Sequence, residues 1–406
     1  MNGAQALMSA ASSSGIDICF ANPGTTELAM IEALDKNKSI RPILSLFEGV
    51  CSGAADGFGR MLGRPAMTLL HLGPGFANAI ANLHNARRAH SPILNIIGDH
   101  ATWHVDYDPP LASDIESLAQ PVSDWFAYAH NTDDCMLKIY DGIEACISAP
   151  AKISTLVVPT DVQEGSYDIS NIVRQKKSPV SWNFNGEKVE KIARRISDYN
   201  DDVIVLLGTK ALTERGQNAA HKIAVKLSAK VFAETFPARW DRGGHISVPD
   251  RFPYFPEAGL SALKNAKTII LVGAKPPIAY FGNNGVPSRL FPENTIYELA
   301  SEAEDAEGAI ISLAKAIGSS NIKTTTGWSA PRQPNLEKPL DVQSCGEMVA
   351  YLLPENSIAM VEGATSTPPF YAASPGGKAH TLITNTGGAI GQGMPVATGA
   401  AIACPD

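Results

Sequence analysis

ILSLFEGVCSGAADGFGR, residues Ile43–Arg60, is the stretch from which the fold and the site of this chain can be worked out. An apolar run, Ile43–Phe47, is long enough for one strand, and a lone carboxylate, Glu48, follows it. The residues after Glu48 are mostly small, which indicates a helix that another part of the molecule approaches closely. A buried carboxyl group has a raised pKa and can exchange a proton with a ligand near neutral pH. The alternative is that Glu48 only provides favourable charge at the N-terminus of the helix.

Composition and charge argue against several classes of protein. The chain has 406 residues, 44% hydrophobic and 18% charged, which is typical of a globular protein with two or three domains. A net charge of −8 argues against nucleic acid and an anionic membrane surface as partners. The six cysteines are scattered, with no C-x-x-C pair and no zinc-ligand spacing, so we expect reduced cysteines in a cytoplasmic protein. We also expect no signal peptide and no membrane span.

Short apolar segments alternate with helical patterns through the first third of the chain. The expected strands are 17–21, 43–47, 66–70 and 93–97, and the expected helices are 4–14, 28–34, 49–61 and 78–88. This alternation predicts an α/β fold with a doubly wound parallel sheet. Ligands of such sheets bind at the carboxyl ends of the strands. Three segments follow expected strands: Asn22–Glu27, Glu48 and the expected turn His71–Gly75. We therefore expect them to meet at one crevice.

Four motifs in this region occur together and in order: NPGTTE at 22–27, FEG with AADGFGR at 47–60, LHLGPGFAN at 70–78, and HSPIL followed by GD at 90–99. They resemble the pyrimidine-binding domain of thiamine-diphosphate-dependent enzymes that act on 2-oxo acids. Within that family the chain is most similar to acetolactate synthase large-subunit-like proteins and to benzoylformate decarboxylase. The resemblance covers the whole first third and implies the thiamine-diphosphate-binding fold.

The resemblance implies roles for individual residues. Glu48 matches the glutamate that hydrogen-bonds N1′ of the cofactor's aminopyrimidine, which activates the thiazolium carbon. The small residues after Glu48 would let that ring lie close to the backbone. The remaining residues expected to bind the cofactor in this domain are Pro23, Gly24, Gly73, Gly75 and Asn78, the last of these by tying its loop to the helix.

Histidines and a hydroxyl are the candidates for substrate chemistry. His71 matches an active-site acid and base of benzoylformate decarboxylase, and imidazole suits proton transfer to a carbonyl oxygen. The alternative is a structural histidine at a strand end. Thr25 matches a substrate-contacting serine, and its hydroxyl is expected to bind the substrate carboxylate. His100 follows a strand end and is expected to line the crevice, beside an aspartate, Asp99, where the family usually has glutamine.

A second α/β unit is expected at 185–320, beyond a polar linker at 165–187, and the first domain is expected to span 1–165. It resembles the central domain of the same family. The dinucleotide fingerprint G-x-G-x-x-G is absent. This domain is structural in most family members and carries FAD in true acetolactate synthases, so the resemblance alone leads us not to expect FAD. Benzoylformate decarboxylase has a second catalytic histidine in this domain. The best match here, PPIAYF at 276–281, offers Tyr280 and Phe281 instead, which argues against that two-histidine chemistry.

Residues 340–406 resemble the opening of the family's diphosphate-binding domain. Thr365 and Ser366 match hydroxyl residues that contact phosphate. In TNTGGAIGQGMP at 384–395, the Gly388 carbonyl is expected to accept from the cofactor's amino group, and Ile390 to bend the cofactor as an apolar wedge. The G-D-G and asparagine that ligate Mg²⁺ in the family are not in this sequence, so we assign no metal ligand and expect a C-terminally truncated chain.

These observations predict a thiamine-diphosphate enzyme that decarboxylates a small 2-oxo acid and joins the product to an acceptor, as acetolactate synthase does. Two alternatives remain: a simple decarboxylase similar to benzoylformate decarboxylase, and a non-catalytic member of the fold. The resemblance implies Mg²⁺ beside the diphosphate. It also implies a homodimer or homotetramer, because family members place the pyrimidine domain of one subunit against the diphosphate domain of another.

Overall fold

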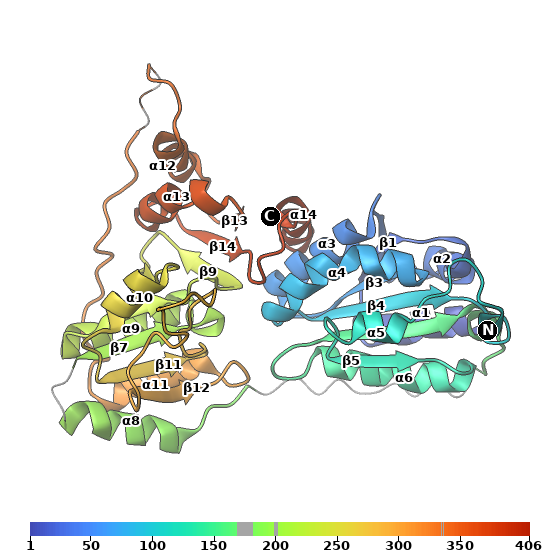
Figure 1. Ribbon diagram of the computed structural model, residues 1–406, viewed down its shortest axis with the longest axis horizontal. Coiled ribbons are helices and arrows are strands. Elements are labelled where there is room, and N and C mark those ends of the chain that lie inside the picture. The colour runs from blue at the N-terminus through green and yellow to red at the C-terminus, as the bar shows by residue number, and fades with distance from the viewer. Residues whose placement is uncertain (169–181, 199–201, 334, 336) are drawn as a thin grey trace. The chain divides into compact units, whose positions relative to one another are not determined.

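The computed structural model describes residues 1–168, 182–198, 202–333, 335 and 337–406, and two compact units are formed (Figure 1). One unit comprises Met1–Val180 with Asn385–Asp406, and the other Ser181–Thr384. The three predicted domains are therefore grouped differently: the segment that begins at 340 is divided after Thr384 between the two units. The predicted linker at 165–187 lies partly outside the described residues.

The first unit contains a six-stranded parallel sheet in the order β2-β1-β3-β4-β6-β5. Its elements are α1 (Gly3–Ser13), β1 (Ile18–Asn22), η1 (Thr25–Glu27), α2 (Leu28–Lys36), β2 (Arg41–Leu44), α3 (Glu48–Leu62), β3 (Ala66–His71), α4 (Leu72–Arg88), β4 (Ile93–Asp99), η2 (Val105–Tyr107), α5 (Ile115–Ala119), β5 (Trp125–Tyr128), α6 (Thr132–Cys146), β6 (Ile153–Pro159), α7 (Thr160–Glu164) and α14 (Gly393–Ala403).

Two apolar cores lie on the two faces of this sheet. Cys19 and Ala21 of β1 belong to the core shared with α1, α2 and α6, whereas Ile18 and Phe20 belong to the core shared with α3, α4 and α5. Successive strand residues point to opposite faces, so one strand contributes to both cores. The sheet is thus covered by helices on both sides, which confirms the predicted doubly wound α/β fold.

The order of the strands fixes where a ligand can bind. β1 has β2 on one side and β3 on the other, so the chain leaves β1 toward one edge and returns on the opposite side. This switch point lies between β1 and β3, and in open α/β sheets the crevice for ligands forms there, outside the carboxyl ends of the strands. The segments that follow β1 and β3 begin at Pro23 and Leu72.

The second unit contains a five-stranded parallel sheet, β10-β8-β7-β11-β12, and a three-stranded sheet, β13-β14-β9. Its elements are α8 (Gly186–Asp198), β7 (Val203–Leu207), η4 (Thr209–Ala211), α9 (Glu214–Leu227), β8 (Lys230–Ala233), β9 (Arg239–Arg242), β10 (Asp250–Arg251), α10 (Pro256–Leu263), β11 (Thr268–Val272), β12 (Ile296–Ala300), α11 (Ala306–Ala316), α12 (Val342–Leu352), β13 (Ser357–Val361), η5 (Ala364–Ser366), α13 (Pro368–Ala373), η6 (Ser374–Gly376) and β14 (His380–Thr384).

Two local predictions were wrong. The strand expected at 43–47 ends at Leu44, so Ser45–Phe47 connect it to α3. The expected turn His71–Gly75 is mostly helix, because α4 begins at Leu72, and Pro74 is tolerated in a first turn where its missing N–H has no helical partner. Farther along the chain, the segment 239–254 contains β9, which pairs antiparallel with β14.

None of the described helices is long and apolar enough to cross a membrane.

Candidate functional site

Glu27 and His71 are hydrogen-bonded to each other across the switch point of the first sheet. The Glu27 side chain is fully buried, and the His71 side chain is 22% exposed. His71 Nδ1 lies 2.9 Å from Glu27 Oε2, which also accepts from the Gly24 N–H at 2.6 Å, while the Thr26 hydroxyl donates to Oε1 at 2.6 Å. Because an ionised carboxylate only accepts, Nδ1 carries the proton of this bond, and Nε2 is left to exchange a proton with a ligand.

Two glycines make room for this pair. A Cβ on Gly24 would lie 2.3 Å from His71 Nδ1, and a Cβ on Gly98, at the end of β4, would lie 2.0 Å from Glu27 Oε1. Either substitution would force the carboxylate or the imidazole to move. The two positions therefore require glycine because side chains approach the backbone there.

Glu48 is the first residue of α3, and its carboxylate reaches the neighbouring helix α4. Asn78 Nδ2 donates to Oε2 at 2.9 Å. Oε1 faces Gly75, where an added Cβ would lie 2.9 Å away, and no group in the described part of the chain donates to it. The expectation that Glu48 is buried was wrong: it is half-buried, because it extends toward the first turns of α4 instead of into the sheet. One oxygen is held by the protein, and the other remains available.

Three asparagines follow one side of α4 at helical spacing. Asn78 binds Glu48, Asn82 Nδ2 donates to the Gly49 carbonyl at 2.6 Å, and Asn85 Nδ2 donates to the Ala389 carbonyl at 2.7 Å. Asn85 Oδ1 accepts from the Ala389 N–H at 3.1 Å. The same face of α4 therefore fixes the start of α3 and the glycine-rich loop before α14. Asn78 holds the catalytic candidate itself, a role that sequence reasoning missed.

The loop that carries Gly388 and Ile390 is fixed to the first unit at its base. α14, which follows the loop, crosses α3 so closely that a Cβ on Gly57 would lie 2.0 Å from the Val396 carbonyl oxygen. Gly388 has a positive φ of 84°, a conformation that glycine adopts without strain, and its N–H is bound by the Asn385 side chain at 2.7 Å. The side chain of Ile390 is 80% exposed.

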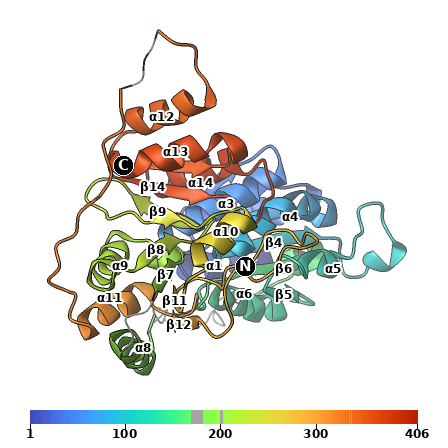
Figure 2. The same ribbon diagram turned by 60° about the vertical axis from the view of Figure 1, so that its left-hand side comes forward.

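The carboxyl end of β4 adds Asp99 and His100 to the same edge of the sheet. Burial raises the pKa of the Asp99 carboxyl, although it accepts from the His100 N–H at 2.8 Å. The loop that follows is fixed at Thr102, which binds Asp161, and at Ser113, which contacts Gly73. Figure 2 shows this loop between β4 and α5 projecting from the unit.

The remaining predicted residues occupy less defined positions. Thr25 is exposed, and it is the adjacent Thr26 that contacts His71, with its hydroxyl 3.2 Å from Nδ1. Pro23 lies in the segment between β1 and η1. Thr365 and Ser366 belong to the second unit, after the carboxyl end of β13, and the Ser366 hydroxyl donates to the Gly363 carbonyl. Their roles remain predictions.

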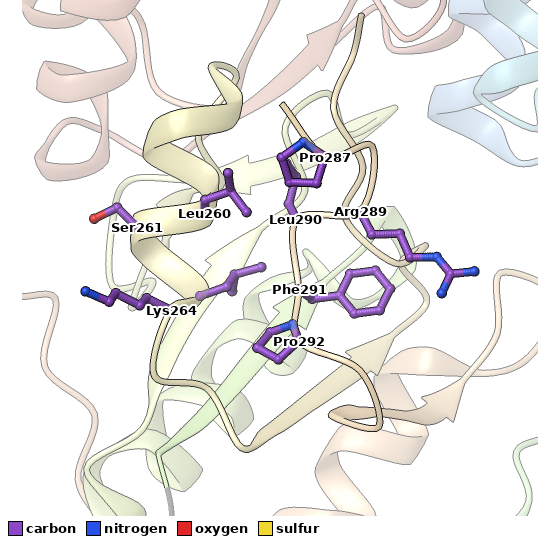
Figure 3. Close-up of a pocket in the computed structure, with 9 residues that line it drawn as sticks. Leu260, Ser261, Lys264, Pro287, Arg289, Leu290, Phe291 and Pro292 are labelled. Atoms are coloured by element: carbon purple, nitrogen blue, oxygen red, sulfur yellow. The ribbon is translucent and has the colours of Figure 1, made fainter. Parts of the chain in front are cut away.

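Neither a metal centre nor the pocket in Figure 3 provides a rival site. No group of three or more metal-ligating side chains occurs among the residues that the structure describes. The pocket lies in the second unit between α10 and residues 287–292 and has a volume of about 640 Å³. The charged ends of Lys264 and Arg289 point to opposite sides of it (Figure 3), so its polar groups do not converge on a ligand.

Comparison with known proteins agrees with this geometry. Residues 1–122 match the model of the thiamine pyrophosphate enzyme N-terminal TPP binding domain. The chain is 39% identical to the acetolactate synthase large-subunit-like protein IlvX of Mycobacterium tuberculosis over 409 aligned residues, which cover 100% of this chain and 77% of that protein. The chain belongs to the thiamine-pyrophosphate-dependent enzymes that act on 2-oxo acids.

Other members of the family are more distant in sequence. The chain is 25% identical to benzoylformate decarboxylase of Pseudomonas aeruginosa, with 96% of this chain and 76% of that protein covered. The solved structure of a thiamine diphosphate-dependent 4-hydroxybenzoylformate decarboxylase from Rhodococcus jostii RHA1 superposes with a TM-score of 0.86 at 19% identity and covers 100% of this chain and 79% of that one. The latter comparison shows the fold, which is that of the thiamine-diphosphate-binding enzymes.

The residues at the crevice fit the family's cofactor. Glu48 Oε1 has no donor in the described chain and lies against Gly75, which has no side chain to fill the space beside it. An available carboxylate oxygen beside open backbone is what a weakly basic ring nitrogen needs in order to share a proton. Gly24 and Gly75 bring backbone close to the His71 ring and the Glu48 carboxylate.

Sequence reasoning missed Glu27, although NPGTTE was recognised as a motif. Its role depends on the pairing of β1 with β3, which places the end of one segment beside residue 71. The available signal was a carboxylate three residues after a glycine at the carboxyl end of the first strand. The spacing of Asn78, Asn82 and Asn85 was a second signal, because residues three and four apart share one helix face.

Proposed function

We propose that this protein uses thiamine diphosphate to decarboxylate a small 2-oxo acid and joins the remaining acyl group to a second 2-oxo acid, as an acetolactate synthase does. The observation that carries the proposal is the presence of two proton-exchanging groups at one sheet edge, Glu48 held by Asn78 and His71 held by Glu27. The similarity to IlvX over the whole chain supports the acceptor step.

Each residue has a defined task in this proposal. When bound, the cofactor supplies the carbon nucleophile and accepts the electron pair that CO₂ leaves behind. Glu48 shares a proton at Oε1 with the cofactor's pyrimidine ring, and Asn78 keeps the carboxylate oriented. His71 moves a proton to and from the substrate carbonyl oxygen at Nε2, while Glu27 stabilises the imidazolium. The Thr25 hydroxyl binds the substrate carboxylate, and His100 lines the crevice beside it.

A second candidate is simple decarboxylation with release of an aldehyde. His71 favours it, because this residue matches an active-site acid and base of benzoylformate decarboxylase and is held in place by Glu27. The likeness to benzoylformate decarboxylase of Pseudomonas aeruginosa also supports it.

Product analysis separates these candidates. The protein is incubated with thiamine diphosphate, Mg²⁺ and either pyruvate or benzoylformate, and CO₂, acetolactate and aldehyde are measured. Acetolactate from pyruvate supports the proposal, and acetaldehyde or benzaldehyde supports the second candidate. Absence of CO₂ with both acids, together with absence of cofactor binding in a calorimetric titration, would leave only a non-catalytic member of the fold.

We propose Mg²⁺ as the companion of the diphosphate, because a divalent cation with oxygen ligands neutralises it well. The hydroxyls of Thr365 and Ser366 and the Gly388 carbonyl are proposed to bind the phosphate and the amino group of the cofactor, with Ile390 as the apolar contact. Titration with thiamine diphosphate in the presence and absence of Mg²⁺ measures this dependence. Equal affinity for thiamine diphosphate with and without Mg²⁺ would contradict the proposed role of the metal.

We propose no flavin in the second unit. Thr209 lies just after β7, and its backbone N–H donates to the Glu234 carboxylate at 2.9 Å. This N–H is therefore not free to bind a diphosphate. Burial raises the pKa of Glu234 to about 7. A Cβ on Gly208 would lie 1.8 Å from the Gly273 carbonyl oxygen, so the ends of β7 and β11 are already in contact. The protein is incubated with FAD and passed through gel filtration. Flavin absorbance in the protein fraction would contradict the proposed absence of flavin.

We propose a homodimer or homotetramer in the cytoplasm. Leu46, Phe47, Ile390 and Met394 are exposed in the first unit and flank Glu48 and Gly388, where a second copy would cover them. All six cysteines are free, which supports a reducing compartment.

A further inference from the structure

His100 has a ring nitrogen for which the protein provides no partner. Its Nε2 is buried, and no hydrogen-bonding group in the described residues reaches it. Buried polar atoms are nearly always paired, so an unpaired one implies a ligand or a water molecule. The ring lies edge-on to His104, with 5.7 Å between centroids, and this contact leaves Nε2 without a partner.

The register of the sheet places His100 beside the Glu27–His71 pair. His71 at the end of β3 pairs with Gly98 in β4, and Glu27 lies over Gly98. His100 is two residues further along the same direction, and side chains two apart in an extended segment share one side. Both histidines therefore follow neighbouring strands at the edge where a ligand of this fold binds.

The backbone that carries His100 is held in place. The His100 backbone N–H donates to Asp99 at 2.8 Å, and two residues later Thr102 binds Asp161 through both its N–H and its hydroxyl, at 3.0 and 2.6 Å. A group that transfers a proton has to stay within reach of the reacting atom, and these three hydrogen bonds keep the segment that bears the ring at the edge of the sheet.

We propose that His100 is a second catalytic histidine, whose Nε2 supplies the proton that replaces CO₂ on the substrate carbon when the product leaves as an aldehyde. The proposal rests on the proposed 2-oxo acid decarboxylation. The balance is R–CO–COO⁻ + H⁺ → R–CHO + CO₂: the C1–C2 bond breaks, its electron pair stays on C2, and a C2–H bond forms with the proton from His100. Solvent then reprotonates the ring, and no oxidant or reductant is needed.

Two histidines divide the proton transfers between two atoms. His71, held by Glu27, serves the carbonyl oxygen, and His100 serves the carbon. His100 therefore determines the product: without its proton on carbon, joining to a second 2-oxo acid remains and aldehyde release does not.

The first test needs no turnover. Protein containing ¹⁵N-histidine, with thiamine diphosphate and Mg²⁺, is titrated with methyl acetylphosphonate and methyl benzoylphosphonate, which carry a phosphonate in place of the 2-oxo acid carboxylate. The signals of His71, His100 and His104 are identified by their loss in the corresponding glutamine variants. We expect His71 and His100 to shift and His104 to stay. If the His71 signal shifts and the His100 signal does not, the proposal for His100 is overturned and the proposed function stands. If neither signal shifts, both the proposal for His100 and the proposed function are overturned.

The second test is the distribution of products. In His100→Gln we expect aldehyde formation to fall by about 10²–10⁴-fold, the usual contribution of a general acid. CO₂ release coupled to added dichlorophenolindophenol, which yields the acid and needs no proton on carbon, should stay within about threefold. His104→Gln, the matched control in the same loop, should change neither. Equal loss of both reactions in His100→Gln indicates binding instead of proton transfer and overturns the proposal, as does unchanged aldehyde formation.

Discussion

Glu48 has one oxygen held by Asn78 and one available, so its replacement by glutamine tests its acid–base role with little change in shape. In Glu48→Gln we expect exchange of the cofactor's C2 proton to slow by about 10²–10⁴-fold, because glutamine cannot accept and return the proton. Hydrogen–deuterium exchange of C2–H, read by NMR after rapid quenching, measures it. Cofactor affinity by calorimetry should change little. The exposed Glu116→Gln in α5 is the control, and unchanged exchange in Glu48→Gln would remove Glu48 from the mechanism.

Glu27 acts through His71, so it is a positioning residue with a readout of its own. The buried carboxylate holds the ring proton on Nδ1, and the Glu27→Gln amide, which can also donate, should leave that proton shared between Nδ1 and Nε2. We expect kcat to fall by about 10–100-fold, as for other hydrogen-bond partners of functional histidines, and the ¹⁵N shifts of the two ring nitrogens of His71 to converge. Glu32→Gln in α2 should change neither. A loss of rate with unchanged ¹⁵N shifts would indicate a structural role only.

At the level of elements, α3 and α14 depend on glycine at their crossing. A Cβ on Gly57 would lie 2.0 Å from the Val396 carbonyl oxygen, and one on Gly399 would lie 1.8 Å from that of Ala54. Gly→Ala elsewhere in a helix stabilises by about 1 kcal/mol. We expect Gly57→Ala to destabilise the protein instead, by about 1–3 kcal/mol, because two backbones must separate.

Thermal unfolding followed by circular dichroism measures this effect, and Ala401→Ser on the exposed side of α14 is the control. Because α14 follows the loop that carries Gly388 and Ile390, Gly57→Ala should also weaken thiamine diphosphate binding. A variant as stable as the parent, with unchanged cofactor affinity, would show that the close crossing is not required.

The fold of the first unit could be predicted from the sequence because its strands alternate with helices and end at recognisable turn residues. β9 could not be predicted, because RWDR is mostly charged and its partner, β14, begins more than a hundred residues later. At the site, Glu48 and His71 could be named from motifs. Their partners Asn78 and Glu27 could be assigned only from pairing and helix packing, which a linear motif does not contain.

At the level of the whole molecule, the exposure of apolar residues near the site supports the proposal that a second copy of the chain completes it. Leu46 is 92% exposed and Ile390 80%, although the first adjoins the segment that leads to Glu48 and the second is the expected apolar contact of the cofactor. An apolar side chain that stays exposed contributes little binding free energy, because the hydrophobic contribution is proportional to the apolar surface removed from water. A second copy that covers these residues would bury them and reduce the exposure of Glu48 at the same time.

This argument predicts that assembly and cofactor binding are linked. Leu46→Ser with Ile390→Ser should shift the protein toward monomer in sedimentation velocity runs and should weaken thiamine diphosphate binding, because the Glu48 carboxylate then stays in water, where a shared proton is held less strongly. Leu137→Ser removes a comparably exposed leucine from α6, whose buried side packs against the opposite face of the sheet, and should change neither property. A monomeric variant that binds the cofactor as tightly as the parent would show that one chain is sufficient for the site.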